Sequence, residues 1–312
     1  AASAFYPSPF ENAAILTLDG VGEWTTTSLS YGHENKIDIL KEISFPDSLG
    51  LLYSAFTYYC GFRVNSGEYK LMGLAPYGNP IYAAKIKDNL IELRRDGSFS
   101  INMSYFDYKV GDRMINDNFR KLFNSPERGF ETENISQFYM DIAASIQAVT
   151  EEAMLGLAQS AKIETGSSNL CLAGGVALNC VGNGKIEQAN IFDNIWIQPA
   201  AGDAGGAIGA ALAFYYDNST NRRSVSKQDS NKGALLGNRY SNDQIDLSLS
   251  KLGAHTHFLE DEEMIEFISQ KISEGQAIGW FQGRMEFGPR ALGARSILGD
   301  PRSAETQKVL NL

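Results

Sequence analysis

Two glycine-rich turns between residues 169 and 216 combine the residue types and spacing best suited to chemistry. Each turn ends a short apolar run and precedes a pattern with helical spacing, first in NLCLAGGVALNCVGNGKI and then in IWIQPAAGDAGGAIGAALAFYY. Gly174 and Gly175 let backbone N–H groups approach a ligand closely, as do Gly205 and Gly206. Because helix N-termini favour anions, the two turns predict a site for a phosphate-bearing ligand.

The first turn, GGVALN, is not one of the common nucleotide-binding loops. It matches neither G-x-x-x-x-G-K-[ST] nor G-x-G-x-x-G, so a tight strand-to-helix junction without a ligand is the alternative. Asn179 and Asn183 are spaced four residues apart on one predicted helix face. Their side-chain amides could reach a ligand or face solvent.

Two aspartates lie at turns of the kind that hold a metal or a phosphate. Asp203 opens the helix predicted after the second turn, where it could cap the first N–H groups or bind a ligand. Asp19 lies in the turn of a hairpin predicted over residues 13–31. An Asp-Gly pair is ordinary turn chemistry. The hydroxyl-rich strand that follows, together with the two glycine turns, makes a functional site at Asp19 a competing interpretation.

A glycine-rich segment near the end of the chain, GRMEFGPRALGARSILGDPR, concentrates four arginines, Arg284, Arg290, Arg295 and Arg302. Because a guanidinium group binds phosphate or carboxylate through two N–H groups, the segment predicts an anion site. A loop that is ion-paired internally through Glu286 and Asp300 is the alternative. His255 and His257 alternate as on a strand but have no third ligand at metal-binding spacing, so no metal site is predicted there.

The rest of the chain must supply the elements that position these residues. Large apolar residues at helical spacing predict helices over 48–62, 135–161 and 261–274, and a shorter helix from Gly67 that Pro76 and Gly78 stop. The run AIGWF predicts a strand at 277–281.

Between these elements, residues 80–130 show little periodicity and are predicted to form an insertion. The polar stretch 218–232 predicts a linker. We therefore expect one domain over residues 1–217 and the start of a second over 233–312.

Composition narrows the class of protein. With 312 residues and 43% hydrophobic content the chain can form full cores, and its net charge of −10 argues against a nucleic-acid partner. Three cysteines without C-x-x-C spacing favour the cytoplasm, and no apolar run is long enough for a membrane span. The oligomeric state is left open.

Six segments together resemble the O-carbamoyltransferase family of nodulation protein U and antibiotic-tailoring enzymes: AASAFYPSPF, LTLDGVGEWTTTS, GEYKLMGLAPYG, LAGGVALN, GDAGGAIGAAL and FGPRALGARSILGDPR. The resemblance implies an α/β fold, with an actin/hexokinase-like (ribonuclease-H-like) ATPase-type domain followed by part of an α/β YrdC-like domain. It implies ATP-dependent transfer of a carbamoyl group from carbamoyl phosphate, through carbamoyl-adenylate, to a hydroxyl of a small-molecule or sugar acceptor.

The resemblance also implies roles for particular residues. Asp19 and Asp203 would hold a divalent metal of the Fe²⁺ type, with Mg²⁺ as the other choice, and Asp19 is the candidate catalytic group. Gly174, Gly175 and Asn179 would contact the adenylate, and Glu68 in GEYK its ribose. In the second domain, Arg290 and Arg295 would belong to the carbamoyl phosphate or ATP site.

This chain departs from the family pattern at its ends. In the family an H-x-x-x-H motif that supplies two metal ligands comes immediately before the segment that starts here at Ala1. We therefore expect a chain that lacks parts at both ends, has a half-built metal site and is inactive alone. The alternatives are another actin/hexokinase-like ATPase or sugar kinase, and a nucleotide-binding module without catalysis.

Overall fold

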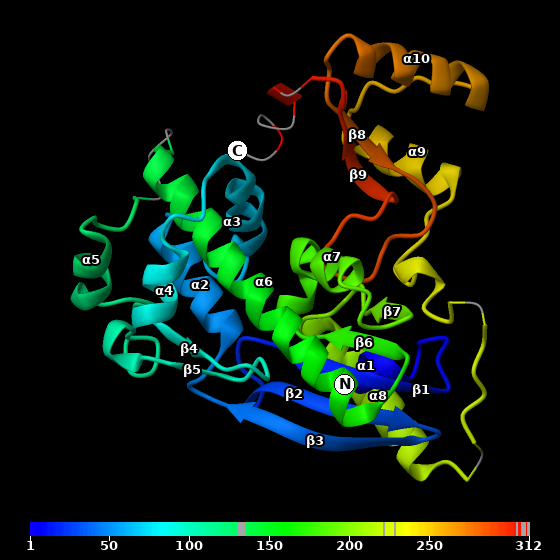
Figure 1. Ribbon diagram of the computed structural model, residues 1–312. Coiled ribbons are helices and arrows are strands. Elements are labelled where there is room, and N and C mark those ends of the chain that lie inside the picture. The colour runs from blue at the N-terminus through cyan, green and yellow to red at the C-terminus, as the bar shows by residue number, and fades with distance from the viewer. Residues whose placement is uncertain (130–134, 221, 228, 304, 307–309, 311–312) are drawn as a thin grey trace. The chain divides into compact units, whose positions relative to one another are not determined.

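The computed structural model in Figure 1 describes residues 1–129, 135–220, 222–227, 229–303, 305–306 and 310. It divides into two compact units, residues 1–230 and residues 231–312. The stretch predicted as a linker, 218–232, spans this division, and its positions 221 and 228 lie outside the described residues. No helix in the described part of the chain has the length and apolar content needed to cross a membrane.

A five-stranded mixed sheet forms the centre of the first unit, in the order β3-β2-β1-β6-β7. Its strands are β1 (Asn12–Leu18), β2 (Thr25–His33), β3 (Lys36–Ser44), β6 (Asn169–Ala173) and β7 (Asn194–Ile197). The first three form an antiparallel meander, whereas β6 pairs parallel to β1 and β7 parallel to β6. The structure thus confirms an α/β fold with a sheet that contains parallel strands.

Strand β3 was not predicted, although the hairpin before it was. Its sequence, KIDILKEIS, lies at the edge of the sheet and is mostly exposed. An edge strand with charged side chains lacks the apolar alternation that marks a half-buried strand, and such charges discourage pairing with another chain. The missing signal is therefore a property of the edge position.

Side chains of β1 alternate between two hydrophobic cores, one on each face of the sheet. Ala14, Leu16 and Leu18 point into the larger core, which also contains residues of α2 (Leu49–Tyr59) and α6 (Gln137–Thr165). Ala13 and Ile15 point into a smaller core beneath α1 (Ala2–Phe5) and α8 (Asp203–Asn218). Burial on both faces explains why this strand is a continuous apolar run.

Helix α6 organises the larger core, as Figure 1 shows by its course across the unit. It packs against α2, α3 (Glu68–Leu74), α4 (Ala83–Asn89), η1 (Ala75–Tyr77) and α7 (Cys180–Gln188). The sequence predicted this helix over 135–161, and it continues one further turn to Gly166, whose φ of 63° ends it in the left-handed conformation. The predicted helices at 48–62 and from Gly67 correspond to α2, capped by Ser48, and to α3 with η1.

Residues 80–130, predicted to form an insertion, contribute side chains to the larger core. They form α4, β4 (Ile91–Leu93), β5 (Phe99–Ile101), η2 (Met103–Tyr105) and α5 (Asp117–Phe123). Ile86, Leu90 and Phe119 are fully buried there. The Phe119 ring packs 5.2 Å from that of Phe56 in α2. Elements of three to seven residues are too short to show a hydrophobic period, and for this reason they were not predicted from the sequence.

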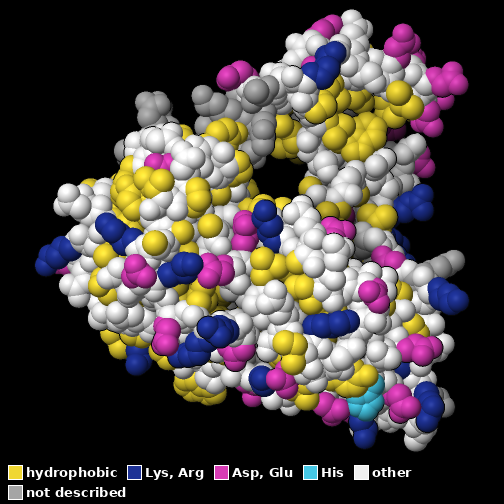
Figure 2. All heavy atoms as spheres, in the orientation of Figure 1, with side chains coloured by type: hydrophobic (Ala, Val, Ile, Leu, Met, Phe, Trp, Pro, Cys, Tyr) yellow, Lys and Arg dark blue, Asp and Glu magenta, His cyan; other side chains and the backbone are white. Residues whose placement is uncertain are grey.

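The second unit contains η4 (Lys232–Ala234), α9 (Asn242–Lys251), α10 (Asp261–Ser273), β8 (Ile278–Phe281) and β9 (Arg295–Leu298). The predicted helix and the AIGWF strand match α10 and β8, whereas α9, which begins with a capping box at Ser241, was not predicted. Among the described residues of this unit, only Ala234 and Ala294 are buried hydrophobic residues. Figure 2 shows hydrophobic side chains gathered on the visible face of this unit.

Arg223 holds the predicted linker against the first unit. It is 8% exposed, and its guanidinium group donates to the carbonyl oxygens of Phe5 (2.9 Å), Tyr6 (3.1 Å), Ser8 (2.8 Å) and Phe10 (2.7 Å). The group also lies 4.4 Å from the centre of the Phe5 ring, within range of a cation–π interaction. Arg223 is therefore part of the first unit's structure.

We expect Arg223→Met to destabilise the chain by about 2–3 kcal/mol, because hydrogen bonds from a charged group are strong and the four carbonyls would lose their donor. Urea unfolding measures this change. The matched control is Arg222→Ala, since Arg222 is exposed and pairs only at 3.4 Å with Glu34 among the contacts described. Equal stability of the two variants would contradict the anchoring role.

Candidate functional site

The carboxyl edge of the parallel strands gathers four of the residues predicted to carry function. Because β1, β6 and β7 run parallel, their carboxyl ends lie at one edge of the sheet. Asp19 follows β1, Gly174 and Gly175 follow β6, and Asp203 comes after β7. The Gly174 N–H donates to Ala201 O at 2.8 Å, so the two glycine turns are direct neighbours. Ligands of open α/β sheets bind at this edge.

Asp19 and the first glycine turn are in contact, although 156 positions separate them. The half-buried Asp19 carboxylate accepts the N–H groups of Gly20 (2.8 Å) and Gly175 (3.1 Å), both through Oδ1. Gly174 has a φ of 89°, and a Cβ there would lie 2.1 Å from Leu18 O. Only glycine therefore allows the turn to approach the end of β1 so closely.

The N-terminus of α2 holds the Asp19 turn from the other side. Ser48 donates its hydroxyl to Asp19 O (3.1 Å) and Gly20 O (2.6 Å) and accepts the N–H of Leu51 (3.0 Å). A Cβ on Gly50 would come within 2.7 Å of Asp19 O, so the first turn of α2 lies directly against this loop. Ser48 is fully buried, which makes its cap a fixed part of the site.

Three helices of eight or more residues begin at this edge, namely α2, α7 and α8. Their N-termini carry partial positive charge, which favours an anion between them. Helix α8 begins at Asp203, whose side chain is exposed and makes no capping hydrogen bond. The N-cap position is Gly202, so the capping interpretation of Asp203 does not describe this structure.

Asn179 is buried and already engaged within the protein. Its Oδ1 accepts the Gly182 N–H at 3.0 Å and caps α7, and it exchanges two hydrogen bonds with the Gln147 amide, at 3.0 and 3.1 Å. Asn183 donates to Ala177 O at 2.7 Å, and its buried Oδ1 has no hydrogen-bond partner in the described part of the chain. The pairing with Gln147 was missed, because no local sequence pattern specifies a partner that lies on a distant segment.

Glu68 lies on an element beside the glycine turn. It is the first residue of α3, and its Oε1 accepts from the Ser54 hydroxyl (2.8 Å) and the Asn65 N–H (2.9 Å). One turn further along α3, Met72 Sδ lies 3.9 Å from the sulfur of Cys180, the first residue of α7. Glu68 and Met72 share a helix face, so this face of α3 adjoins the start of α7.

In the second unit, Arg295 is part of a network inside its own loop. It donates to Gly288 O at 2.6 Å, and its Nε lies 3.4 Å from a carboxylate oxygen of Glu286. Glu286 is 3% exposed and accepts the N–H groups of Leu292 (2.9 Å) and Ala294 (2.6 Å). The buried carboxylate therefore folds the loop around itself and fixes Arg295.

Two more of the four arginines are used internally. Arg302 forms a two-pronged ion pair with Asp300, its shortest contact being 2.7 Å, and Arg284 donates to Gly237 O at 2.8 Å. Arg295 and Arg302 thus pair with carboxylates of their own segment, as the alternative interpretation expected, and a role for Arg295 at an anion site stays a prediction. Arg290 is half-buried in the same segment, and its role at an anion site stays a prediction.

No cluster of three His, Cys, Asp or Glu side chains in the described ranges is arranged to hold a metal ion. Asp19 and Asp203 share one edge of the sheet, and no third ligand joins them there among these residues. His255 and His257 are both exposed.

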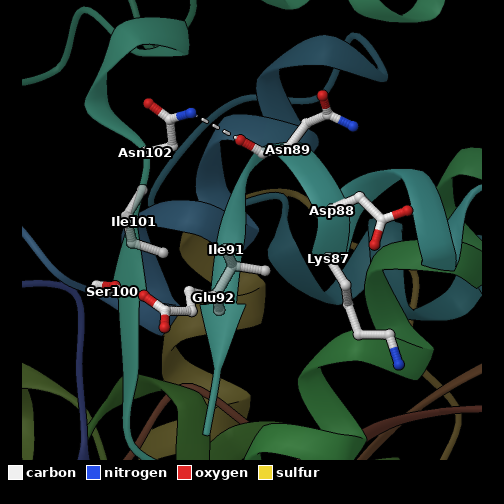
Figure 3. A pocket seen from close by; sticks show the side chains of 8 residues that line it. All are labelled: Lys87, Asp88, Asn89, Ile91, Glu92, Ser100, Ile101 and Asn102. Atoms are coloured by element: carbon white, nitrogen blue, oxygen red, sulfur yellow. Dashed lines mark hydrogen bonds between the residues drawn. The ribbon is translucent and has the colours of Figure 1, made fainter.

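A pocket of about 220 Å³ lies elsewhere in the first unit, between the end of α4 and the β4–β5 hairpin. Figure 3 shows its lining side chains, Lys87, Asp88, Asn89, Ile91, Glu92, Ser100, Ile101 and Asn102. Asn102 donates to Asn89 O across one end at 2.9 Å. None of the residues predicted to carry function lines this pocket.

Comparison with known proteins adds family matches to this geometry. Residues 1–212 match the family model described as carbamoyltransferase N-terminus, and residues 269–312 match the one described as carbamoyltransferase C-terminus. These matches confirm the resemblance carried by the six sequence segments.

Curated relatives align along the whole chain. It is 55% identical to the uncharacterized protein sll1178 of Synechocystis sp., with 100% of this chain and 51% of that protein aligned. It is 36% identical to nodulation protein NolNO of Sinorhizobium fredii (99% and 43% aligned) and 34% identical to nodulation protein NolO of Bradyrhizobium diazoefficiens (100% and 54%). The chain spans about half the length of the curated relatives it matches.

We expect Gly174→Ala to destabilise the first unit by at least about 2 kcal/mol, because the new Cβ meets Leu18 O in a left-handed backbone conformation. Chemical unfolding measures this loss. The control is Gly184→Ala inside α7, where a Cβ has open space. Alanine there should raise the free energy of unfolding by about 0.5–1 kcal/mol. Unchanged stability of the Gly174→Ala variant would show that the first unit does not require the close approach of the turn to β1.

Proposed function

Because this chain belongs to the carbamoyltransferase family, we propose that its first unit takes part in the ATP-dependent transfer of a carbamoyl group to an acceptor hydroxyl. The donor is carbamoyl phosphate, activated as carbamoyl-adenylate. The observation that carries this proposal is the contact between the Asp19 carboxylate and the Gly175 N–H at the edge where three helices begin. It places a carboxylate, a glycine turn and positive helix ends in one site.

The adenylate phosphate fits this edge electrostatically. The N-termini of α2, α7 and α8 attract an anion, and the Gly174–Gly175 turn lets it approach the backbone. Glu68, on the face of α3 that adjoins α7, is proposed to contact the ribose. Asn179 acts in this proposal mainly by capping α7 and holding the turn, because its side chain is bonded to Gly182 and Gln147.

A phosphate at the glycine turn would lie next to the Asp19 carboxylate, since both compete for the same N–H groups. Two anions so close repel each other unless a cation lies between them. This supports a divalent metal, for which Asp19 and Asp203 are the proposed ligands in this chain. When bound, such a metal would neutralise the phosphate and polarise the carbamoyl carbonyl.

The described residues fit such a metal only in part. Two carboxylates suit a hard cation such as Mg²⁺ better than the Fe²⁺ type that the resemblance implies. We derive no reaction step through the metal.

The chain's own residues would act by binding and orientation. The acceptor hydroxyl oxygen attacks the carbamoyl carbon, the bond from that carbon to the phosphate oxygen breaks, and AMP leaves with the charge that the helix N-termini stabilise. Asp19 Oδ2, to which no hydrogen bond is found within the described ranges, is the oxygen available to a metal or to the hydroxyl proton. Exclusion of water protects the acyl-adenylate from hydrolysis.

The finer fold assignments belong to the same proposal. An antiparallel three-strand meander joined to parallel strands, as in β3-β2-β1-β6-β7, supports an actin/hexokinase-like domain over residues 1–217. Residues 233–312 are proposed as the start of a YrdC-like domain that forms carbamoyl-adenylate, with Arg290 and Arg295 at its anion site. The match of residues 269–312 to the C-terminal family model supports a separate role for this part.

Product analysis tests the proposed reaction. Labelled ATP, carbamoyl phosphate, Mg²⁺ or Fe²⁺ and a panel of sugar and small-molecule hydroxyl acceptors are incubated with the protein. The proposal expects AMP and pyrophosphate. ADP would support a kinase or other ATPase, and ATP binding without turnover a non-catalytic module. Carbamoylation by this chain alone, as fast as by a longer form, would contradict the expectation that it is inactive alone.

We expect Mg²⁺ to strengthen AMP binding by the wild-type chain about tenfold or more, which is about 1.4 kcal/mol, and Asp19→Asn to abolish this gain. The variant keeps an oxygen for the Gly20 and Gly175 N–H groups but removes the charge that attracts the cation. Isothermal titration with and without Mg²⁺ measures the difference. The control is Asp193→Asn, an exposed carboxylate just before β7, at the opposite edge of the sheet. An unchanged Mg²⁺ effect in Asp19→Asn would exclude Asp19 as a ligand.

A further inference from the structure

Gln147 is a buried polar residue of α6 that no sequence motif marks, and it uses its complete hydrogen-bonding capacity. It is 5% exposed. Its Oε1 accepts from the Tyr53 hydroxyl and the Asn179 amide, both at 3.0 Å. Its Nε2 donates to Asn179 Oδ1 at 3.1 Å and to Glu151 Oε1 at 2.9 Å. A glutamine amide has two donor and two acceptor positions, so all four are filled.

The direction of this network is fixed from both ends. At one end the Gly182 N–H can only donate, so Asn179 must present its oxygen to it. At the other end the carboxylate of Glu151 accepts, so Gln147 turns its nitrogen toward it. The two amides between these ends can then pair in only one orientation. This arrangement fixes the rotamer of Asn179, since a flipped amide would leave buried groups unsatisfied.

Asn179 connects this network to the glycine turn. It ends η3 (Gly175–Leu178) and caps α7, and its own N–H bonds to Val176 O at 2.9 Å. Only the single turn of η3 separates it from Gly175, whose N–H reaches Asp19. A displacement of Asn179 therefore moves the turn that faces the proposed phosphate.

We propose that Gln147 is the positioning residue of this site, acting through Asn179 to hold the glycine turn in its anion-binding conformation. The inference rests on the proposed function for its ligand, a nucleoside monophosphate or the corresponding adenylate. It goes beyond that function in assigning part of the binding geometry to the middle of a core helix. Gln147 touches no ligand in this scheme.

The test compares AMP affinity, by isothermal titration, for the wild-type chain and Gln147→Met, which keeps the side-chain length but removes all four hydrogen bonds. We expect Gln147→Met to weaken AMP binding tenfold or more at a temperature where both proteins are folded. The matched control is Thr150→Val, because Thr150 is also buried in α6 and its hydroxyl bonds only to Ile146 O among the contacts described. It should lower the unfolding midpoint and leave AMP affinity within twofold.

A double-mutant cycle separates positioning from a general loss of packing. Asn179→Ser keeps an N-cap side chain for α7 but breaks the link to Gln147. If Gln147 acts through Asn179, adding Gln147→Met to Asn179→Ser should weaken AMP binding by less than a further twofold. If the double variant weakens AMP binding by the full product of the two single-variant factors, the inference is overturned.

Two further outcomes are decisive. Wild-type affinity in Gln147→Met would overturn the inference while leaving the proposed function standing, and no AMP binding by the wild-type chain would overturn both. Should Gln147→Met fail to fold, Gln147→Glu replaces it. That variant sets an oxygen against the Glu151 carboxylate and is expected to weaken AMP binding to the same extent.

Discussion

Helix α2 is the element on which the candidate site depends, because three of its hydroxyl groups each hold a different part of it. Ser48 at the N-cap bonds to the carbonyls of Asp19 and Gly20. Tyr53 donates to Gln147, which pairs with Asn179 of the glycine turn, and Ser54 donates to Glu68 on α3. Tyr53 and Ser54 are consecutive, so two neighbouring residues of α2 hold the Gln147–Asn179 pair on one side of the site and Glu68 on the other. The geometry of the site is thus set by a rigid helix in the main core and not by its own loops.

The sheet places the N-terminus of α2, which carries partial positive charge, at the edge that forms the candidate site. Parallel pairing of β1, β6 and β7 directs three turns to one edge, and α2, α7 and α8 begin with their positive ends toward that edge. The same edge carries Asp19 and Asp203, so positive backbone dipoles and negative side chains balance each other. Such a balance suits a ligand that combines an anion with a cation better than either one alone.

The sequence predicted the parts of this arrangement that have a local cause. Neighbouring residues alone specify the glycine turns, the Asp-Gly hairpin and the long apolar periodicity of α6. Strand β3 and the elements of 80–130 were not predicted. An exposed edge strand lacks a hydrophobic period, and elements of three to seven residues are too short to show one. The contact of Asp19 with Gly175 and the pairing of Gln147 with Asn179 join distant segments, and no local pattern specifies such partners.

The Arg223 anchor has a consequence for the conditions under which the first unit stays closed. The described acceptors of its guanidinium group are backbone carbonyls, which do not gain protons in acid as exposed carboxylates do. Surface ion pairs such as Lys41 with Glu164 weaken as salt rises or carboxylates protonate. The attachment of Arg223 to the start of the chain therefore does not depend on an ionised carboxylate.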